Sequence, residues 1–219
     1  MVEERVLSLL KEIEKGNNYG EKINAVAATK TVPVETINKA IKLGISAVAE
    51  NRVQEFLLKT SDIVGAEQQF IGHLQTNKVK YLVGKVSLIQ SVDSINLAEE
   101  INKRALKLNV VQNILIEINV CGELSKSGFS VDNVKQEILP IFNLKGIKVK
   151  GLMAMLPKSE DQNYLASLCK KMRSIYDYFN EQGKNFEYLS VGMSKDYKIA
   201  IQNGSNTIRP GRALFGERV

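Results

Sequence analysis

Short apolar, β-branched runs alternate along this chain with longer amphipathic segments. The runs predict eight strands, at residues 23–29, 47–49, 69–72, 86–91, 110–120, 147–153, 186–190 and 206–209. The segments between them have the apolar spacing of helices, at about 34–44, 51–61, 75–83, 94–108, 131–141, 160–182 and 194–203. Before the first strand, Val6, Leu9, Leu10 and Ile13 predict a further amphipathic helix.

Strands that alternate with helices without interruption are typical of a parallel sheet, and eight such units favour closure into a (β/α)8 barrel. A doubly wound open sheet is the alternative. However, no G-x-G-x-x-G motif follows the first predicted strand, and no linker or shift in composition divides the chain. We therefore expect residues 1–219 to form a single TIM-barrel domain with an extra N-terminal helix.

Composition and charge argue against several classes of protein. The net charge of +6 is spread along helical faces, which indicates a solvated surface rather than a nucleic-acid site. The longest apolar run, at residues 152–156, is too short to span a bilayer. The N-terminal segment carries Glu3 and Glu4 and lacks the apolar core of a signal peptide, so we expect a cytoplasmic protein. Two distant cysteines, Cys121 and Cys169, and a single histidine do not predict a metal site.

In a parallel barrel, functional residues lie just beyond the carboxyl ends of the strands. Lys30 follows the first predicted strand; its amine either forms a Schiff base with a carbonyl or simply extends into solvent, and position alone favours the second interpretation. Glu50 ends the second strand, where a local ion pair is as plausible as catalysis. His73 follows the third strand. It is a candidate acid or base, but a lone histidine is more commonly a structural hydrogen-bonding residue.

Two interpretations of residues 189–216 stay open. Gly192 and Ser194 precede a predicted helix, and Gly211 follows the eighth strand. Backbone N–H groups and a hydroxyl at such places suit a phosphate, which barrels often bind with the loops after strands seven and eight. Ser194 as an ordinary helix N-cap and Gly211 as an ordinary turn residue explain the same pattern equally well.

Six motifs follow one another along nearly the whole chain. They are AATKTVP around Lys30, AENRVQE at 49–55, FIGHLQTNK at 70–78, SKSGF at 125–129, GLMAM at 151–155 and GMSKDYKIAIQNGSNTIRPGRALFGER at 192–218. In content and order they resemble the motifs of the pyridoxal phosphate homeostasis protein family. This resemblance is far more specific than any one motif.

The resemblance implies a barrel of fold type III, like the N-terminal domain of alanine racemase, that holds pyridoxal 5′-phosphate (PLP) as a Schiff base. Lys30 matches the family's Schiff-base lysine. Ser194 and Gly211 match positions that hold the phosphate, and Arg209 matches the arginine that faces the pyridine nitrogen. Asn51 matches a neighbour of the cofactor ring.

The chain departs from the family pattern in two loops. Ala49 and Arg52 stand where the usual motif, G-E-N-Y-V-Q-E, has glycine and an aromatic residue, which leaves the packing near the ring open. Pro210 and Arg212 are closer to the racemase version of the last motif, which leaves the contacts of the phosphate loop open. Lys126 in SKSGF is interpreted as a solvated loop charge.

An arginine donates hydrogen bonds only, so Arg209 would keep the pyridine nitrogen unprotonated and weaken the ring as an electron sink. Related enzymes add a second β-domain and a partner subunit, and here the chain ends soon after the predicted barrel. We therefore expect a monomeric carrier without catalytic residues, which limits free PLP and delivers it to apo-enzymes, with neither nucleic acid nor membrane as partner. The alternative is a PLP-dependent amino-acid racemase with Lys30 and His73 as bases; a nucleic-acid-binding protein is the least favoured.

Overall fold

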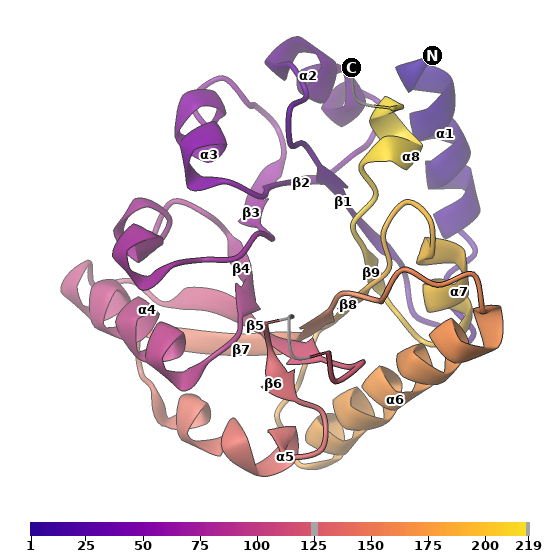
Figure 1. Ribbon diagram of the computed structural model, residues 1–219. Coiled ribbons are helices and arrows are strands. Elements are labelled where there is room, and N and C mark those ends of the chain that lie inside the picture. The colour runs from indigo at the N-terminus through magenta and orange to yellow at the C-terminus, as the bar shows by residue number, and fades with distance from the viewer. Residues whose placement is uncertain (124–126, 218–219) are drawn as a thin grey trace.

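The computed structural model describes residues 1–123 and 127–217 (Figure 1). Its strands are β1 Asn24–Ala28, β2 Ala47–Glu50, β3 Glu67–Phe70, β4 Leu88–Val92, β5 Gln112–Asn119, β6 Phe129–Ser130, β7 Ile147–Ala154, β8 Tyr188–Val191 and β9 Thr207–Ile208. Its α-helices are α1 Val2–Ile13, α2 Val34–Lys42, α3 Val53–Lys59, α4 Ile95–Lys107, α5 Val134–Glu137, α6 Gln162–Glu181, α7 Tyr197–Gln202 and α8 Arg212–Phe215, and its 3-10 helices are η1 Thr76–Tyr81 and η2 Leu139–Asn143.

Eight of the strands close into a parallel barrel. Neighbouring strands follow the order β4-β3-β2-β1-β9-β8-β7-β5, and pairing between β4 and β5 completes the ring. The two-residue strand β6 pairs with the carboxyl end of β5. Figure 1 shows the strands around the barrel axis with the helices outside them. The predicted (β/α)8 barrel is confirmed, and the alternative open sheet is wrong.

The strands form because their residues are buried from both sides. Every residue of β2 and β4 is buried, as are four of the five in β1, which is the pattern of parallel strands covered by helices outside and by side chains inside. The predicted N-terminal helix is confirmed as α1, which buries Val6, Leu9 and Ile13 and packs against α2 and α8. Across the described ranges, no helix combines the length and apolar character that crossing a bilayer requires.

Three predicted helices differ in the structure. The segment predicted as one helix at 131–141 forms the short α5 and then η2, because Pro140 at the start of η2 has no N–H to continue an α-helix. The helix predicted at 194–203 begins only at Tyr197, so Ser194 lies in the preceding loop. The segment at 75–83 adopts the tighter 3-10 form over Thr76–Tyr81.

Polar side chains inside the barrel form one directed chain of hydrogen bonds. Nη1 of Arg209 donates to Oγ of Ser190 at 2.6 Å, and that hydroxyl donates to Oε1 of Gln90 at 2.7 Å. Nε2 of Gln90 donates to Oε1 of Gln69 at 2.7 Å, and Gln69 donates to Glu67 at 3.4 Å. The chain runs from the carboxyl mouth of the barrel toward the amino ends of its strands, and the partners offset the desolvation of these buried groups.

Glu117 of β5 is also buried, with 5% of its surface exposed. Burial, followed by the charge of Asp93, raises the pKa of its carboxyl to about 7, although the charges of Arg209 and His73 act in the opposite direction. The carboxyl group therefore changes charge near neutral pH.

Gly72, two residues beyond β3, lies against the backbone that follows β2. A Cβ atom at position 72 would stand 1.9 Å from the carbonyl oxygen of Asn51 and 2.6 Å from its carbonyl carbon. The carbonyl oxygen of Gly72 also accepts a hydrogen bond from Oγ of Ser91 at 2.5 Å. Only glycine permits this approach, and the contact sets the position of the loop that carries Asn51.

The buried carboxyl predicts a pH-dependent effect of Glu117→Gln. Because its folded-state pKa lies above the unfolded value, Glu117 stabilises the fold fully at acid pH and this stabilisation is lost as pH rises through about 7. Glutamine keeps the shape without the charge, so the variant should be more stable than wild type at pH 8 by on the order of 2 kcal/mol. Thermal unfolding at pH 5 and pH 8 measures this; an equal difference at both values would contradict it.

The close approach at position 72 predicts that Gly72→Ala destabilises the fold by roughly 2–3 kcal/mol, because backbone atoms must move to admit the methyl group. Gly20→Ala is the matched control: Gly20 has φ +75°, but no atom lies within 4 Å of its Cβ position. The control should lose only about 1 kcal/mol from backbone strain. Urea unfolding compares the two, and equal losses would show that contact with Asn51 is unimportant.

Candidate functional site

The five residues predicted to form a site lie at one mouth of the barrel. Lys30 stands two residues beyond β1, Asn51 directly after β2, Ser194 in the loop after β8, and Arg209 and Gly211 just after β9. The order β2-β1-β9-β8 makes these strands neighbours. The structure therefore brings together four strand ends that are far apart in sequence.

Strand register sets the relative heights of these residues. Ala28 pairs with Ala49, so two residues further along Lys30 and Asn51 leave the sheet at the same level. On the other side of β1, the backbone N–H of Ala28 donates to the carbonyl oxygen of Pro210 at 2.9 Å. The segment that carries Gly211 is thus hydrogen-bonded to β1, which ends two residues before Lys30.

Lys30 is half-buried. Within residues 1–123 and 127–217, its amine has neither a hydrogen-bond nor an ion-pair partner. The flanking residues, in contrast, are held firmly: Oγ1 of Thr29 donates to Oε1 of Glu50 at 2.7 Å, and the N–H of Thr31 donates to Oε2 of Glu55 at 2.8 Å. The arrangement is an unpaired amine on a fixed backbone, which suits a nucleophile.

Ser194 and Gly211 are in direct contact. Oγ of Ser194 accepts hydrogen bonds from the N–H of Gly211 at 3.0 Å and from the N–H of Ala213 at 3.1 Å. Gly211 is the N-cap of α8, so Ser194 caps that helix from a loop 17 residues away rather than capping α7. Gly192 permits this loop, since φ there is +104° and a Cβ would stand 2.8 Å from Cα of Tyr197.

Arg209 is almost completely buried, with 2% of its surface exposed. Besides Ser190 Oγ, its guanidinium donates to the carbonyl oxygens of Ser190 at 2.7 Å and Ala154 at 2.8 Å. Burial lowers its pKa to about 10, against the opposing charges of Glu117 and Asp196, so the side chain is a cation at neutral pH. These contacts use three of the five N–H groups of the guanidinium, and two remain for an acceptor beyond them.

The remaining sequence candidates have simpler surroundings. Nδ1 of His73 lies 3.2 Å from a carboxylate oxygen of Asp93, and its side chain is 63% exposed, which favours the hydrogen-bonding interpretation. Arg52, where the family pattern has an aromatic residue, is exposed at the start of α3. Lys126 lies outside the described residues.

Sequence reasoning missed the partner of Glu50. Its carboxylate contacts Lys59, nine residues further along, at 2.8 Å, rather than a charged residue close to it in sequence. Lys59 also contacts Glu55 at 3.2 Å. The spacing of Glu55 and Lys59 on one helix face was a usable signal, whereas nothing local indicated the contact with Glu50. Oε2 of Glu50 is buried without a hydrogen-bond partner in the described structure.

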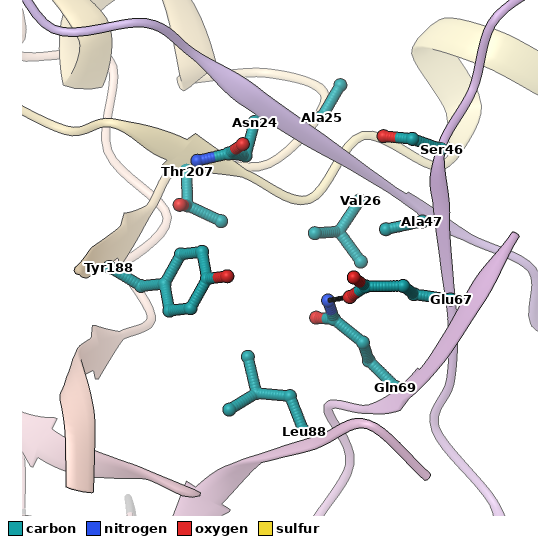
Figure 2. A pocket seen from close by; sticks show the side chains of 10 residues that line it. All are labelled: Asn24, Ala25, Val26, Ser46, Ala47, Glu67, Gln69, Leu88, Tyr188 and Thr207. Atoms are coloured by element: carbon teal, nitrogen blue, oxygen red, sulfur yellow. Dashed lines mark hydrogen bonds between the residues drawn. The ribbon is translucent and has the colours of Figure 1, made fainter. Parts of the chain in front are cut away.

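A small cavity of about 80 Å³ lies at the opposite mouth of the barrel (Figure 2). The residues that line it stand at or near the amino ends of the strands: Asn24, Ala25, Val26, Ser46, Ala47, Glu67, Gln69, Leu88, Tyr188 and Thr207. Figure 2 shows Tyr188 reaching into it across from Glu67 and Gln69. It contains none of the five predicted site residues and is therefore separate from the candidate site.

The family model described as alanine racemase, N-terminal domain, matches residues 13–219. Two curated relatives, both called pyridoxal phosphate homeostasis protein, are similar over most of their length. The relative from Aquifex aeolicus is 42% identical, over 98% of this chain and 94% of its own. The relative from Escherichia coli K12 is 30% identical, over 90% of this chain and 87% of its own.

Solved structures with the same fold include a protein related to this chain and a more distant racemase. PipY of Synechococcus elongatus PCC7942 without PLP superposes with a TM-score of 0.89 at 27% identity, covering 99% of this chain and 100% of PipY. PipY with PLP bound gives 0.86 at 26% identity, with the same coverage. Alanine racemase of Clostridium difficile 630 shares the fold alone, with a TM-score of 0.76 at 18% identity over 98% of this chain and 56% of the racemase. The chain therefore belongs to the pyridoxal phosphate homeostasis protein family.

Proposed function

We propose that this protein binds PLP at the carboxyl mouth of its barrel through a Schiff base on Lys30, and acts in intracellular PLP homeostasis. The observation that carries the proposal is that Lys30, whose amine has no partner among the described residues, stands at the same barrel mouth as Ser194, Gly211 and Arg209. Its relatives' names and the PLP-bound PipY structure support the same cofactor. We further propose that residues 1–219 act as one monomeric barrel domain in the cytoplasm.

The side chains present fit each part of PLP. Phosphate oxygens could accept hydrogen bonds from the hydroxyl of Ser194 and from the N–H groups of Gly211 and Ala213. In this structure the two N–H groups donate to Oγ of Ser194. Arg209 has two N–H groups left for the pyridine nitrogen. Asn51, which directly follows β2 at the level of Lys30, would supply an amide to the cofactor ring.

Lys30 supplies the covalent step. Its neutral amine attacks the aldehyde carbon of PLP, and loss of one water molecule leaves a carbon–nitrogen double bond. The reverse reaction takes up water and returns both the amine and the aldehyde. PLP, when bound, supplies a reactive aldehyde and an electron-accepting ring. A reversible bond of this kind suits a protein that stores the aldehyde and releases it to apo-enzymes.

Arg209 favours a carrier over an enzyme. Its pKa of about 10 keeps it cationic at neutral pH, so it would donate a hydrogen bond to the pyridine nitrogen but keep its own protons, because it is a much weaker acid than a protonated pyridine. A pyridine ring that stays neutral stabilises a carbanion poorly. His73, the second base of a racemase mechanism, is 63% exposed and paired with Asp93. We therefore propose that the protein lacks strong catalytic activity.

The proposal predicts that Lys30→Ala abolishes the visible absorption band that develops when PLP is added and weakens PLP binding at least about tenfold, because the covalent bond is lost. Equilibrium dialysis and absorbance spectra measure both effects. Lys42→Ala, which removes an exposed lysine at the end of α2, is the control and should match wild type. An unchanged band and unchanged stoichiometry in Lys30→Ala would refute the Schiff base at this residue.

A carrier should not labilise the α-proton of amino acids. With PLP loaded, the protein in deuterated buffer should exchange α-protons of alanine no faster than free PLP at the same concentration. Proton NMR of the recovered amino acid measures the exchange. Exchange that is faster with wild type and absent with Lys30→Ala would overturn the carrier proposal in favour of a racemase-like enzyme.

A further inference from the structure

Lys59, at the end of α3, is a mostly buried cation whose partners surround the loop after β1. Its Nζ donates to the carbonyl oxygen of Thr29 at 3.0 Å, to Oε1 of Glu50 at 2.8 Å and to Oε2 of Glu55 at 3.2 Å. The side chain of Lys59 is 14% exposed and that of Glu50 only 4%. One ammonium group therefore ties α3, the end of β2 and the end of β1 together.

The same carboxylates hold the residues on both sides of Lys30. Oε1 of Glu50, which contacts Lys59, also accepts from Oγ1 of Thr29. Oε2 of Glu55, which contacts Lys59 as well, accepts from the backbone N–H of Thr31. Lys30 itself stands between these two anchored residues.

The backbone at Thr31 requires such an anchor. Its φ is +63°, in the left-handed region that a β-branched side chain disfavours. The other described non-glycine residues with positive φ are asparagines, Asn109 and Asn185, which tolerate this conformation better. Strained conformations persist only where surrounding contacts determine them. The hydrogen bond from Thr31 N–H to Glu55 is such a contact.

Glu55 stays charged in this position. Its partial burial raises the pKa of the carboxyl, but the N–H of Thr31, the hydrogen bond and charge of Lys59, and the charge of Arg52 together hold the pKa below its usual range. A charged acceptor makes a stronger hydrogen bond than a neutral one. The anchor of Thr31 therefore depends on Lys59 as well as on Glu55.

We propose that Lys59 is a positioning residue for Lys30: through Glu50 and Glu55 it fixes the backbone on both sides of Lys30 and so sets the direction in which the Lys30 amine leaves the barrel. This inference rests on the proposed role of Lys30 as the residue that bonds to PLP. Lys59 itself need not contact PLP. Misplacement of a nucleophile by about 1 Å lowers a reaction rate by up to a hundredfold.

The test compares Lys59→Met, which keeps the length of the side chain without the charge, with Lys150→Met. Lys150 of β7 is the matched control, since it is 15% exposed and paired with a single carboxylate, Glu187, in the amino half of the barrel. Lys59→Arg restores the cation. The double variant Lys59→Met/Glu50→Gln removes both charges of the Lys59–Glu50 pair, so no buried charge is left without a partner. If Lys59→Met alone fails to fold, the double variant takes its place in every comparison.

Two measurements are made on each variant. In the protein without PLP, hydrogen exchange of the Thr31 amide is followed by NMR; after PLP is mixed in, the rate constant of the visible absorption band is recorded. Lys59→Met should exchange the Thr31 amide at least about tenfold faster and form the band at least about tenfold more slowly. Lys59→Arg should recover most of the protection of the Thr31 amide and most of the rate of band formation. Lys150→Met should match wild type in both measurements.

Unchanged exchange and rate in folded Lys59→Met, or equal changes in Lys150→Met, would overturn the positioning role. The two proposals fail separately. If wild type forms no band with PLP, the proposed function is wrong, and the hydrogen exchange of Thr31 alone then decides whether Lys59 fixes this backbone. Faster exchange with an unchanged rate of band formation overturns the inference, because the fixed backbone would not matter to Lys30.

Discussion

Hydrogen bonding between β4 and β5 closes the sheet, and this closure is the constraint on which the candidate site depends. In a closed parallel barrel every strand ends at the same mouth, so residues separated by most of the chain meet there. Strand register then sets their heights: Ala28 lies beside Ala49, and Ser190 beside Thr207. A shift of register would move Lys30 relative to Asn51 and to the segment of Gly211.

At the carboxyl mouth, charged groups whose desolvation costs free energy are buried together with the hydrogen-bond partners that offset this cost. Arg209 is desolvated, and two carbonyl oxygens and the hydroxyl of Ser190 accept its N–H groups. Glu50 is desolvated as well, and Lys59 and Thr29 contact one of its oxygens. Among the residues that the structure describes, the amine of Lys30 at the same mouth has neither a hydrogen-bond nor an ion-pair partner. A site built in this way holds the backbone on both sides of a reactive amine in place.

The alternation of apolar runs and amphipathic segments was enough to predict the barrel, because each strand is buried from both sides and each helix from one. β6 was missed because Phe129–Ser130 is defined as a strand by its pairing with the end of β5, and the predicted helix at 131–141 was too long because Pro140 cannot continue an α-helix. The placement of Lys30, Asn51, Ser194, Arg209 and Gly211 at one mouth followed from the barrel and the family resemblance. No local pattern predicts the hydrogen bonds from Gly211 and Ala213 to Ser194, because the fold brings together two loops that are distant in sequence. The bond from Lys59 to Glu50 likewise joins the end of α3 to the end of β2, and it forms only once the helix packs on the barrel.

The central claim is that the amine of Lys30 bonds covalently to PLP. The most direct measurement is reduction of the wild-type protein with borohydride in the presence of PLP, followed by proteolysis and mass mapping of the labelled peptide. The account predicts a single reduced adduct on the peptide that contains Lys30, in proportion to the PLP bound. Bound PLP that leaves no adduct on this peptide, or an adduct at another lysine instead, would contradict it.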